Sequence, residues 1–197
     1  SSQRHQGLEM METKYLQSLL DEIGQSVHNL NTIAVALSNL PSSYSVDPNL
    51  NIKWVPKNVN ASSIAARRYA VRSSIVFAAE ILFEYMNCIS DDPLWKSLNN
   101  DLNFKVKLAS HDSKAKRFSE FCKSIPGIEK EWYLLVELMC HWRNRIVHVS
   151  TSKAQLSSTD RQFLESKHNE IYENYHHFEI KKALADFEAD DAVIFIG

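Results

Sequence analysis

Apolar residues recur every three or four positions along the segment from Met10 to Asn39. The recurring positions are Leu16, Leu19, Leu20, Ile23, Val27, Leu30, Ile33, Ala34 and Leu37. This spacing places the apolar side chains along one side of an α-helix, so the segment is predicted to be an amphipathic helix that buries one face. Pro41 follows directly and is expected to end it.

Residues that interrupt helices are scarce in the rest of the chain, with four Gly and five Pro among 197 residues. We therefore predict further helices over residues 61–90, 113–125, 128–149, 157–178 (or 158–178) and 179–188. Asn60 or Ser62 is expected to cap the helix over residues 61–90, and Ser157 or Ser158 is expected to cap the helix that ends at residue 178. Its second half, residues 75–86, is apolar almost all round, which predicts the central and most buried helix. The fourth predicted helix has an apolar stripe at Trp132, Leu135, Met139, Trp142, Ile146 and Val149.

Together these elements predict an all-α protein built as an up-and-down helical bundle, with one domain over residues 10–190. Residues 1–9 are polar and without a pattern, and are expected to be a frayed or non-native terminus. Residues 191–197 are expected to form a C-terminal tail. Residues 41–60 form a long connection with three prolines, which Ile52, Trp54 and Val55 are expected to pin to the body.

The overall charge gives little information about partners, because the formal net charge is −2 and a passive nucleic-acid binder is usually basic. Three widely spaced cysteines form no CxxC pair, which favours reduced thiols in a cytoplasmic protein. The longest apolar run, residues 75–83, is too short to cross a bilayer, so no membrane partner is expected.

Residues 141–148 read His-Trp-Arg-Asn-Arg-Ile-Val-His and end the fourth predicted helix. Two Arg, two His and one Asn within eight residues allow two interpretations. Cations near a helix C-terminus are favoured by the helix dipole, so the segment could be a solvated helix end. The order of the residues supports a different interpretation.

The order of Arg143, Asn144 and His148 resembles the RxxxxH motif of the HEPN superfamily (higher eukaryote and prokaryote nucleotide-binding domain). That resemblance implies an HEPN-like helical domain and a ribonuclease that needs neither metal nor other cofactor. It implies attack by the RNA 2′-hydroxyl, which leaves a 2′,3′-cyclic phosphate or 3′-phosphate and a 5′-hydroxyl. It also implies a toxin or an effector of anti-phage defence, whose partner is an antitoxin or regulatory protein. The alternative is a non-catalytic HEPN-like module for dimerisation or nucleotide binding.

The implied reaction gives each residue of the motif a role. His148 is expected to act as general acid and base, because imidazole titrates near neutral pH. Arg143 is expected to hold the phosphate and its transition state, because guanidinium is always charged and binds phosphate oxygens in a bidentate fork. Asn144 would orient His148 or a phosphate oxygen, and Arg145 and His141 would make further substrate contacts.

Helix geometry indicates that Arg143 and His148 do not act together within one chain. They are five residues apart and point about 140° from each other on an ideal helix. A site that needs both is more easily completed by two copies around a twofold axis. The HEPN resemblance implies the same homodimer, with a composite cleft between the subunits.

Residues from the second predicted helix are candidates for supporting roles. Glu80 interrupts an apolar run, and a buried carboxylate needs a partner. One possibility is that Glu80 or Glu84 braces Arg143. The alternative is an ion pair elsewhere or a partly exposed carboxylate. Arg68 and Arg72, four apart, either extend an RNA-binding surface or pair with surface carboxylates. No metal site is expected from His168, His176 and His177, because adjacent side chains on a helix point apart.

Overall fold

The fold is described by a computed structural model, which covers residues 14–42, 44–91, 93, 114–123, 127–148 and 155–189. Within these ranges the chain forms seven helices and no strand, so the predicted all-α class is confirmed. The predictions for residues 1–9, Val149 and residues 191–197 lie outside the described residues.

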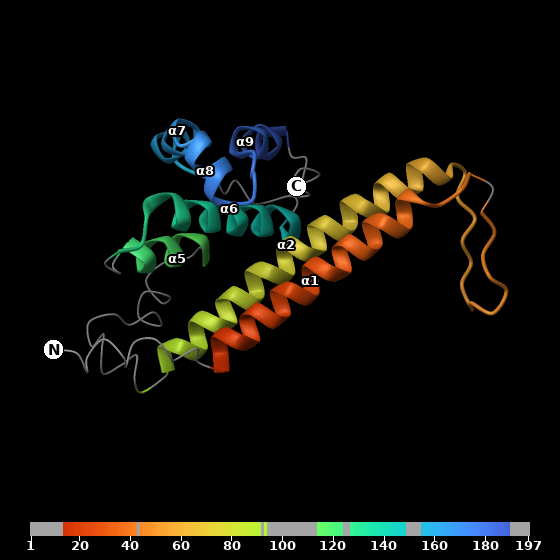
Figure 1. Cartoon of the computed structure of the whole chain (residues 1–197), viewed down its shortest axis with the longest axis horizontal. Helices are drawn as coiled ribbons and strands as arrows, with labels where there is room; N and C mark the ends of the chain where they lie inside the picture. Colours follow the sequence, from red (N-terminus) through yellow and green to blue (C-terminus); the bar gives the residue numbers. More distant parts are fainter. Residues whose placement is uncertain are drawn as a thin grey trace.

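A long antiparallel hairpin of α1 (Lys14–Ser38) and α2 (Val59–Asp91) runs the length of the molecule (Figure 1). Both helices lie within a few residues of their predicted bounds. The predicted cap at Asn60 or Ser62 is wrong, because the side-chain oxygen of Asn58 accepts the backbone N–H of Ala61 at 2.9 Å. A cap at Asn58 satisfies an N–H of the first turn and sets the start of α2 at Val59.

The remaining helices lie on one side of this hairpin, with α6 (Lys130–Val147) among them (Figure 1). α6 packs against α2, against α5 (Lys114–Lys123) and against α7 (Ser158–Ser166). Its side chains Leu134, Leu138 and Trp142 are almost completely buried. The central helix is therefore α6 rather than α2, where Phe77 of the apolar segment is 43% exposed.

The buried face of α6 is also different from its predicted stripe. Trp132 is 40% exposed, while Leu135, Met139 and Ile146 are only partly buried. Neighbours on several sides bury a wider part of the helix, which includes Tyr133, Leu134, Leu138, Cys140, His141 and Trp142. A single stripe describes a helix with one neighbour, and α6 has more than one.

The predicted single helix over residues 157–178 is in fact two helices, α7 and α8 (His168–Asn174). They are separated at Lys167, whose backbone N–H donates to the carbonyls of both Phe163 and Leu164, the tightened pattern of a helix end. After α8 the chain turns through His176 and His177, both with positive φ, and then enters α9 (Ile180–Ala189).

The connection between α1 and α2 extends beyond the end of the hairpin (Figure 1). The rings of Tyr44 and Trp54 meet edge to face at 5.9 Å between centroids, which holds its two sides together. Ile52 is 62% exposed and Val55 is 83% exposed, so the prediction that they pin the connection to the body is wrong. Trp54 is half-buried, and its aromatic partner Tyr44 belongs to the connection itself.

One hydrophobic core joins α2, α5, α6 and the three C-terminal helices. Its largest fully buried side chains include Phe118 and Phe121 of α5, Trp142 of α6, Leu164 of α7 and Ile180 of α9. None of the helices in the described ranges combines the length and the apolar character needed to cross a membrane.

Candidate functional site at the end of α6

The candidate site is built on the C-terminal end of α6. The helix continues to Val147, and His148 is the first residue beyond it, with φ of −117° and ψ of 55°. The backbone N–H of His148 still donates to the carbonyl of Asn144 at 2.9 Å. His148 is exposed, whereas Arg143 and Asn144 are partly buried one turn earlier.

Arg143 is held in place by a carboxylate from α2. Its Nε donates to Oε1 of Glu80 at 2.7 Å, and its Nη2 lies 2.6 Å from the same oxygen. Its Nη1 donates to Oδ1 of Asn144 at 3.2 Å. A guanidinium has five N–H donors, so these three contacts leave donors for another acceptor. The Arg143 side chain is 16% exposed, which gives an anion access to part of the group.

The pairing of Arg143 with Glu80 is one of the alternatives that the sequence left open. Glu84, one turn further along α2, instead accepts a weak hydrogen bond from the Cys88 thiol, with 3.8 Å between sulfur and oxygen. Asn144 directs its side-chain oxygen to Arg143. This contact orients the guanidinium. The contacts expected between Asn144 and His148 or a phosphate oxygen stay predictions.

Arg145 anchors another helix. Its guanidinium carbon lies 3.5 Å from the centroid of the Phe187 ring, and its Nη1 donates a short hydrogen bond to the carbonyl of Phe187. The ring of Phe187 also meets Trp142 edge to face at 5.1 Å. Arg145 therefore attaches α9 to α6, and this geometry does not favour the predicted substrate contact.

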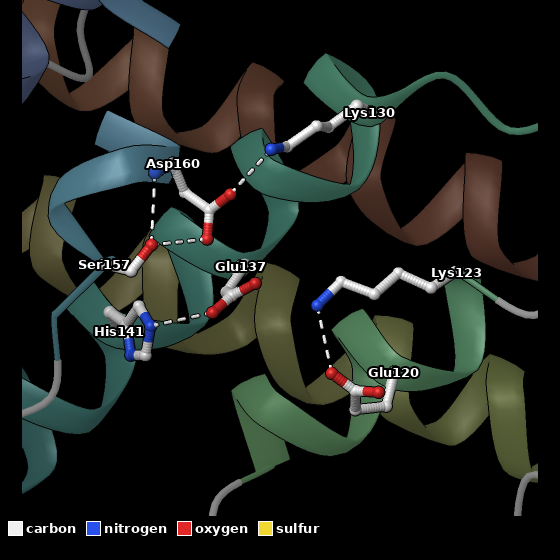
Figure 2. Close-up of polar contacts among 7 residues, drawn as sticks. All are labelled: Glu120, Lys123, Lys130, Glu137, His141, Ser157 and Asp160. Atoms are coloured by element: carbon white, nitrogen blue, oxygen red, sulfur yellow. Dashed lines mark hydrogen bonds and ion pairs between the residues drawn. The ribbon is translucent and has the colours of Figure 1, made fainter. Parts of the chain in front are cut away.

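His141 is a buried residue of α6. Its side chain turns towards Glu137 of the same helix (Figure 2). Its Nε2 lies 3.3 Å from Oε1 of Glu137, and both side chains are largely shielded from solvent. This position does not favour the predicted contact with substrate. The spacing of Glu137 and His141, four apart on a helix, was a signal for this pair that the sequence prediction did not use.

Next to His141, a polar cluster attaches α7 to α6 (Figure 2). Ser157 caps α7 by accepting the backbone N–H of Asp160 at 3.1 Å, so one of the two predicted caps is confirmed. Asp160 also lies 2.9 Å from the Lys130 ammonium. Burial by itself would raise the pKa of the Asp160 carboxyl, but hydrogen bonds from Lys130 and Ser157 outweigh it and lower that pKa.

Arg68 and Arg72 are exposed on α2. Arg72 is four residues after Arg68 and three before Ile75, so the three side chains lie on one side of α2. This side carries buried core residues near α6. Arg72 is eight residues before Glu80, which is roughly 12 Å along the helix axis. The two cations therefore continue along α2 from the Arg143–Glu80 pair.

The described residues contain no group of three or more His, Cys, Asp or Glu that could hold a metal ion. His176 and His177 were expected to lie on a helix. They lie instead in the turn after α8. No protein-family model, curated protein or solved structure matches this chain.

Proposed function

We propose that this protein is a metal-independent endoribonuclease of the HEPN type, in which Arg143 binds the scissile phosphate and His148 transfers protons. The observation that carries the proposal is the fixed Arg143 guanidinium. Glu80 and Asn144 hold it beside the end of α6, where His148 follows as an exposed residue. A preorganised cation from one copy and an exposed imidazole from another would suit a reaction that moves protons around a phosphate.

The proposed reaction needs two proton transfers at one phosphate. A base removes the proton of the 2′-hydroxyl while its oxygen forms a bond to phosphorus. The bond from phosphorus to the 5′-oxygen breaks, and an acid gives that oxygen a proton. Arg143 stabilises the extra negative charge on the phosphate oxygens, since a guanidinium can donate two parallel hydrogen bonds.

A second copy of the chain completes this site in the proposal. Residues five apart on an ideal helix point about 140° from each other. Arg143 lies within α6 and His148 directly follows its last residue, Val147. Two subunits related by a twofold axis would place Arg143 of one near His148 of the other. They would also provide two imidazoles, one to accept a proton and one to donate it.

Arg68 and Arg72 extend the proposed RNA-binding surface along α2, where they would contact phosphates on either side of the cleaved bond. The biological role that goes with such an activity is that of a toxin or a defence effector restrained by a separate antitoxin or regulatory protein. This part of the proposal rests on the resemblance of residues 143–148 to the HEPN motif.

The test is cleavage of mixed RNA by the purified protein in EDTA. Wild type is expected to cleave, and both Arg143→Ala and His148→Ala are expected to lose the activity. Arg161→Ala on α7 and His28→Ala on α1 replace the same residue types outside residues 141–148 and should cleave normally. The new 5′ ends should accept phosphate from a polynucleotide kinase without prior phosphatase treatment, because the products carry a 5′-hydroxyl.

Two results would contradict the proposal. Cleavage that survives in both motif variants would place the activity elsewhere or in a contaminant. RNA or nucleotide binding without cleavage by wild type would support the alternative, a non-catalytic dimerisation or nucleotide-binding module.

A further inference from the structure

A long groove runs between α1 and α2. It consists of two adjoining hollows of about 670 and 320 Å3, which share Glu22 and Phe77. The groove extends along α1 from Tyr15 to Ile33, which corresponds to roughly 27 Å of helix. It is mostly apolar, and we call it the hairpin groove.

The hairpin groove opens on the side of α2 that faces away from the core. Ile75 is buried in the core, and Phe77 lies two residues later and so points about 160° away. Phe77 is 43% exposed and Tyr69 is 75% exposed, although aromatic side chains of this size are usually well covered. The groove is therefore separate from the candidate site, which lies on the α6 side.

α1 has an apolar face that its own chain covers incompletely. It packs mainly against α2, and Leu19 is its one buried residue among the described positions. Of the apolar α1 residues that line the groove, Leu30 is half-buried and Ile33 is 42% exposed. An apolar groove that its own chain leaves open in this way can bind another molecule.

The connection at the tip of the hairpin carries exposed apolar residues that could fill an apolar groove. We call residues 44–57 the arm. Leu50, Ile52 and Val55 of the arm are all more than half exposed. The arm projects beyond the hairpin and does not fold back onto its own groove (Figure 1). The Tyr44–Trp54 contact closes it into one unit.

The arm and the hairpin groove also fit each other in size and charge. From Tyr44 to Leu50 one side of the arm spans at most roughly 20 Å, which is within the length of the groove. Glu22 and Glu84 line the groove, and neither lining contains Lys or Arg. The arm carries Lys53, Lys57 and the carboxylate of Asp47, all exposed, so its formal charge is +1. Opposite charges at the edge of an apolar contact favour one orientation and one partner.

We propose that the hairpin groove binds the arm of a second copy of this chain, with the two chains exchanging arms around a twofold axis. Each chain then buries the exposed apolar residues of its partner's arm, and no unpaired arm or groove remains. This pairing is a different contact from the twofold pairing that the proposed nuclease requires, because the groove opens away from the α6 side. It is argued from the groove and the arm alone, and its tests use no RNA, so either proposal can fail without the other.

The first test measures oligomeric state by sedimentation velocity over a wide range of protein concentration. Wild type is expected to have twice the mass of one chain. Phe77→Glu in the groove and the double variant Ile52→Glu, Val55→Glu in the arm are each expected to reduce it to one chain. Tyr172→Glu is the matched control, because Tyr172 is 40% exposed on α8 and lies outside the groove. Circular dichroism checks that each variant retains its helices.

The second test identifies the arm as the occupant and changes only exposed charges. One chain carries Glu22→Lys and Glu84→Lys, and the other carries Lys53→Glu and Lys57→Glu. Each chain alone has a groove and an arm of like charge, so it is expected to be monomeric. In a mixture, the groove of each chain is opposite in charge to the arm of the other, so a heterodimer is expected.

A monomeric wild type would overturn the proposal. So would a dimer that survives both Phe77→Glu and the arm variant, because it would use a different surface. Charge-reversed chains that form homodimers, or that remain monomeric when mixed, would show that the arm is not the occupant of the groove.

Discussion

Glu80 of α2 and Arg143 of α6 are 63 residues apart in the sequence and form an ion pair with 2.6 Å between the carboxylate oxygen and Nη2. The pair connects the hairpin to the helix that ends in the candidate site. Because Nε of Arg143 also donates to the same oxygen, the orientation of the guanidinium plane is fixed. This arrangement separates two effects of Glu80, one on stability and one on the position of Arg143.

Replacing Glu80 with Gln is expected to affect RNA cleavage much more than folding. The Glu80 side chain is 41% exposed, so the loss in unfolding free energy should be about 1 kcal/mol or less. A misplaced guanidinium should lower kcat/KM by about tenfold to a hundredfold. Urea denaturation and RNA cleavage measure the two effects. Glu165→Gln, which removes the carboxylate of the exposed Arg161–Glu165 pair on α7, is the control and should leave cleavage unchanged; equal activity of both variants would refute the positioning role.

Arg145→Met is expected to destabilise the protein without removing its activity. The substitution removes a hydrogen bond to the Phe187 carbonyl and the stacking of a cation on the Phe187 ring. The expected loss is about 1–3 kcal/mol in unfolding free energy. Activity per folded molecule should stay near wild type at a temperature where both proteins are folded. A variant of normal stability that no longer cleaves RNA would restore Arg145 as a substrate contact.

The stability of the protein is expected to fall in acid partly because of Asp160. The pKa of this carboxyl lies below its ordinary value of 3.8, since hydrogen bonds from Lys130 and Ser157 outweigh the effect of burial. A lowered folded-state pKa stabilises the fold above the unfolded pKa, and this contribution is lost as the pH falls through the folded pKa. In Asp160→Asn this part of the loss below about pH 4 should be absent. Thermal unfolding from pH 7 to pH 2 would show it, and curves of identical shape would contradict it.

The three cysteines are expected to differ in reactivity towards a maleimide at pH 8. Burial raises the pKa of the Cys122 thiol to about 12, so it carries almost no thiolate in the folded protein. Cys88 is partly exposed, although burial and the neighbouring Glu84 raise its pKa as well. Mass spectrometry should find Cys88 labelled first and Cys122 labelled only after unfolding in denaturant. Equal labelling of the two in the folded state would contradict the burial of α5 against α6.

The sequence was sufficient to predict the long helices. α1, α2 and α6 were found because their apolar residues recur with helical spacing over many turns, and α7 because Ser157 is a favourable cap. The break at Lys167 could not be predicted, because neither Gly nor Pro marks it. α7 and α8 both pack onto the hydrophobic core, and the spacing of apolar residues in a sequence does not show where such tertiary packing breaks a helix.

The candidate site shows the same limit. The pattern of residues 143–148 identified the segment, and the cost of leaving Glu80 without a partner pointed to Arg143. The pattern could not show that Arg145 turns towards α9 or that His141 is buried against Glu137. Those directions depend on which helices lie beside α6. The prediction for the arm was wrong for a related reason. Ile52 and Val55 are apolar and were expected to pack against the rest of the protein, but both are exposed.

The incomplete cover of α1 also determines how the molecule opens. A helix that one neighbour secures can detach while the rest of the protein stays folded, because few apolar contacts must separate. Backbone amide protons of α1 should then exchange with deuterated solvent well before those of α6, which is enclosed on several sides. α1 would thus be the least protected cooperative unit, and any molecule that binds to it would slow exchange there first.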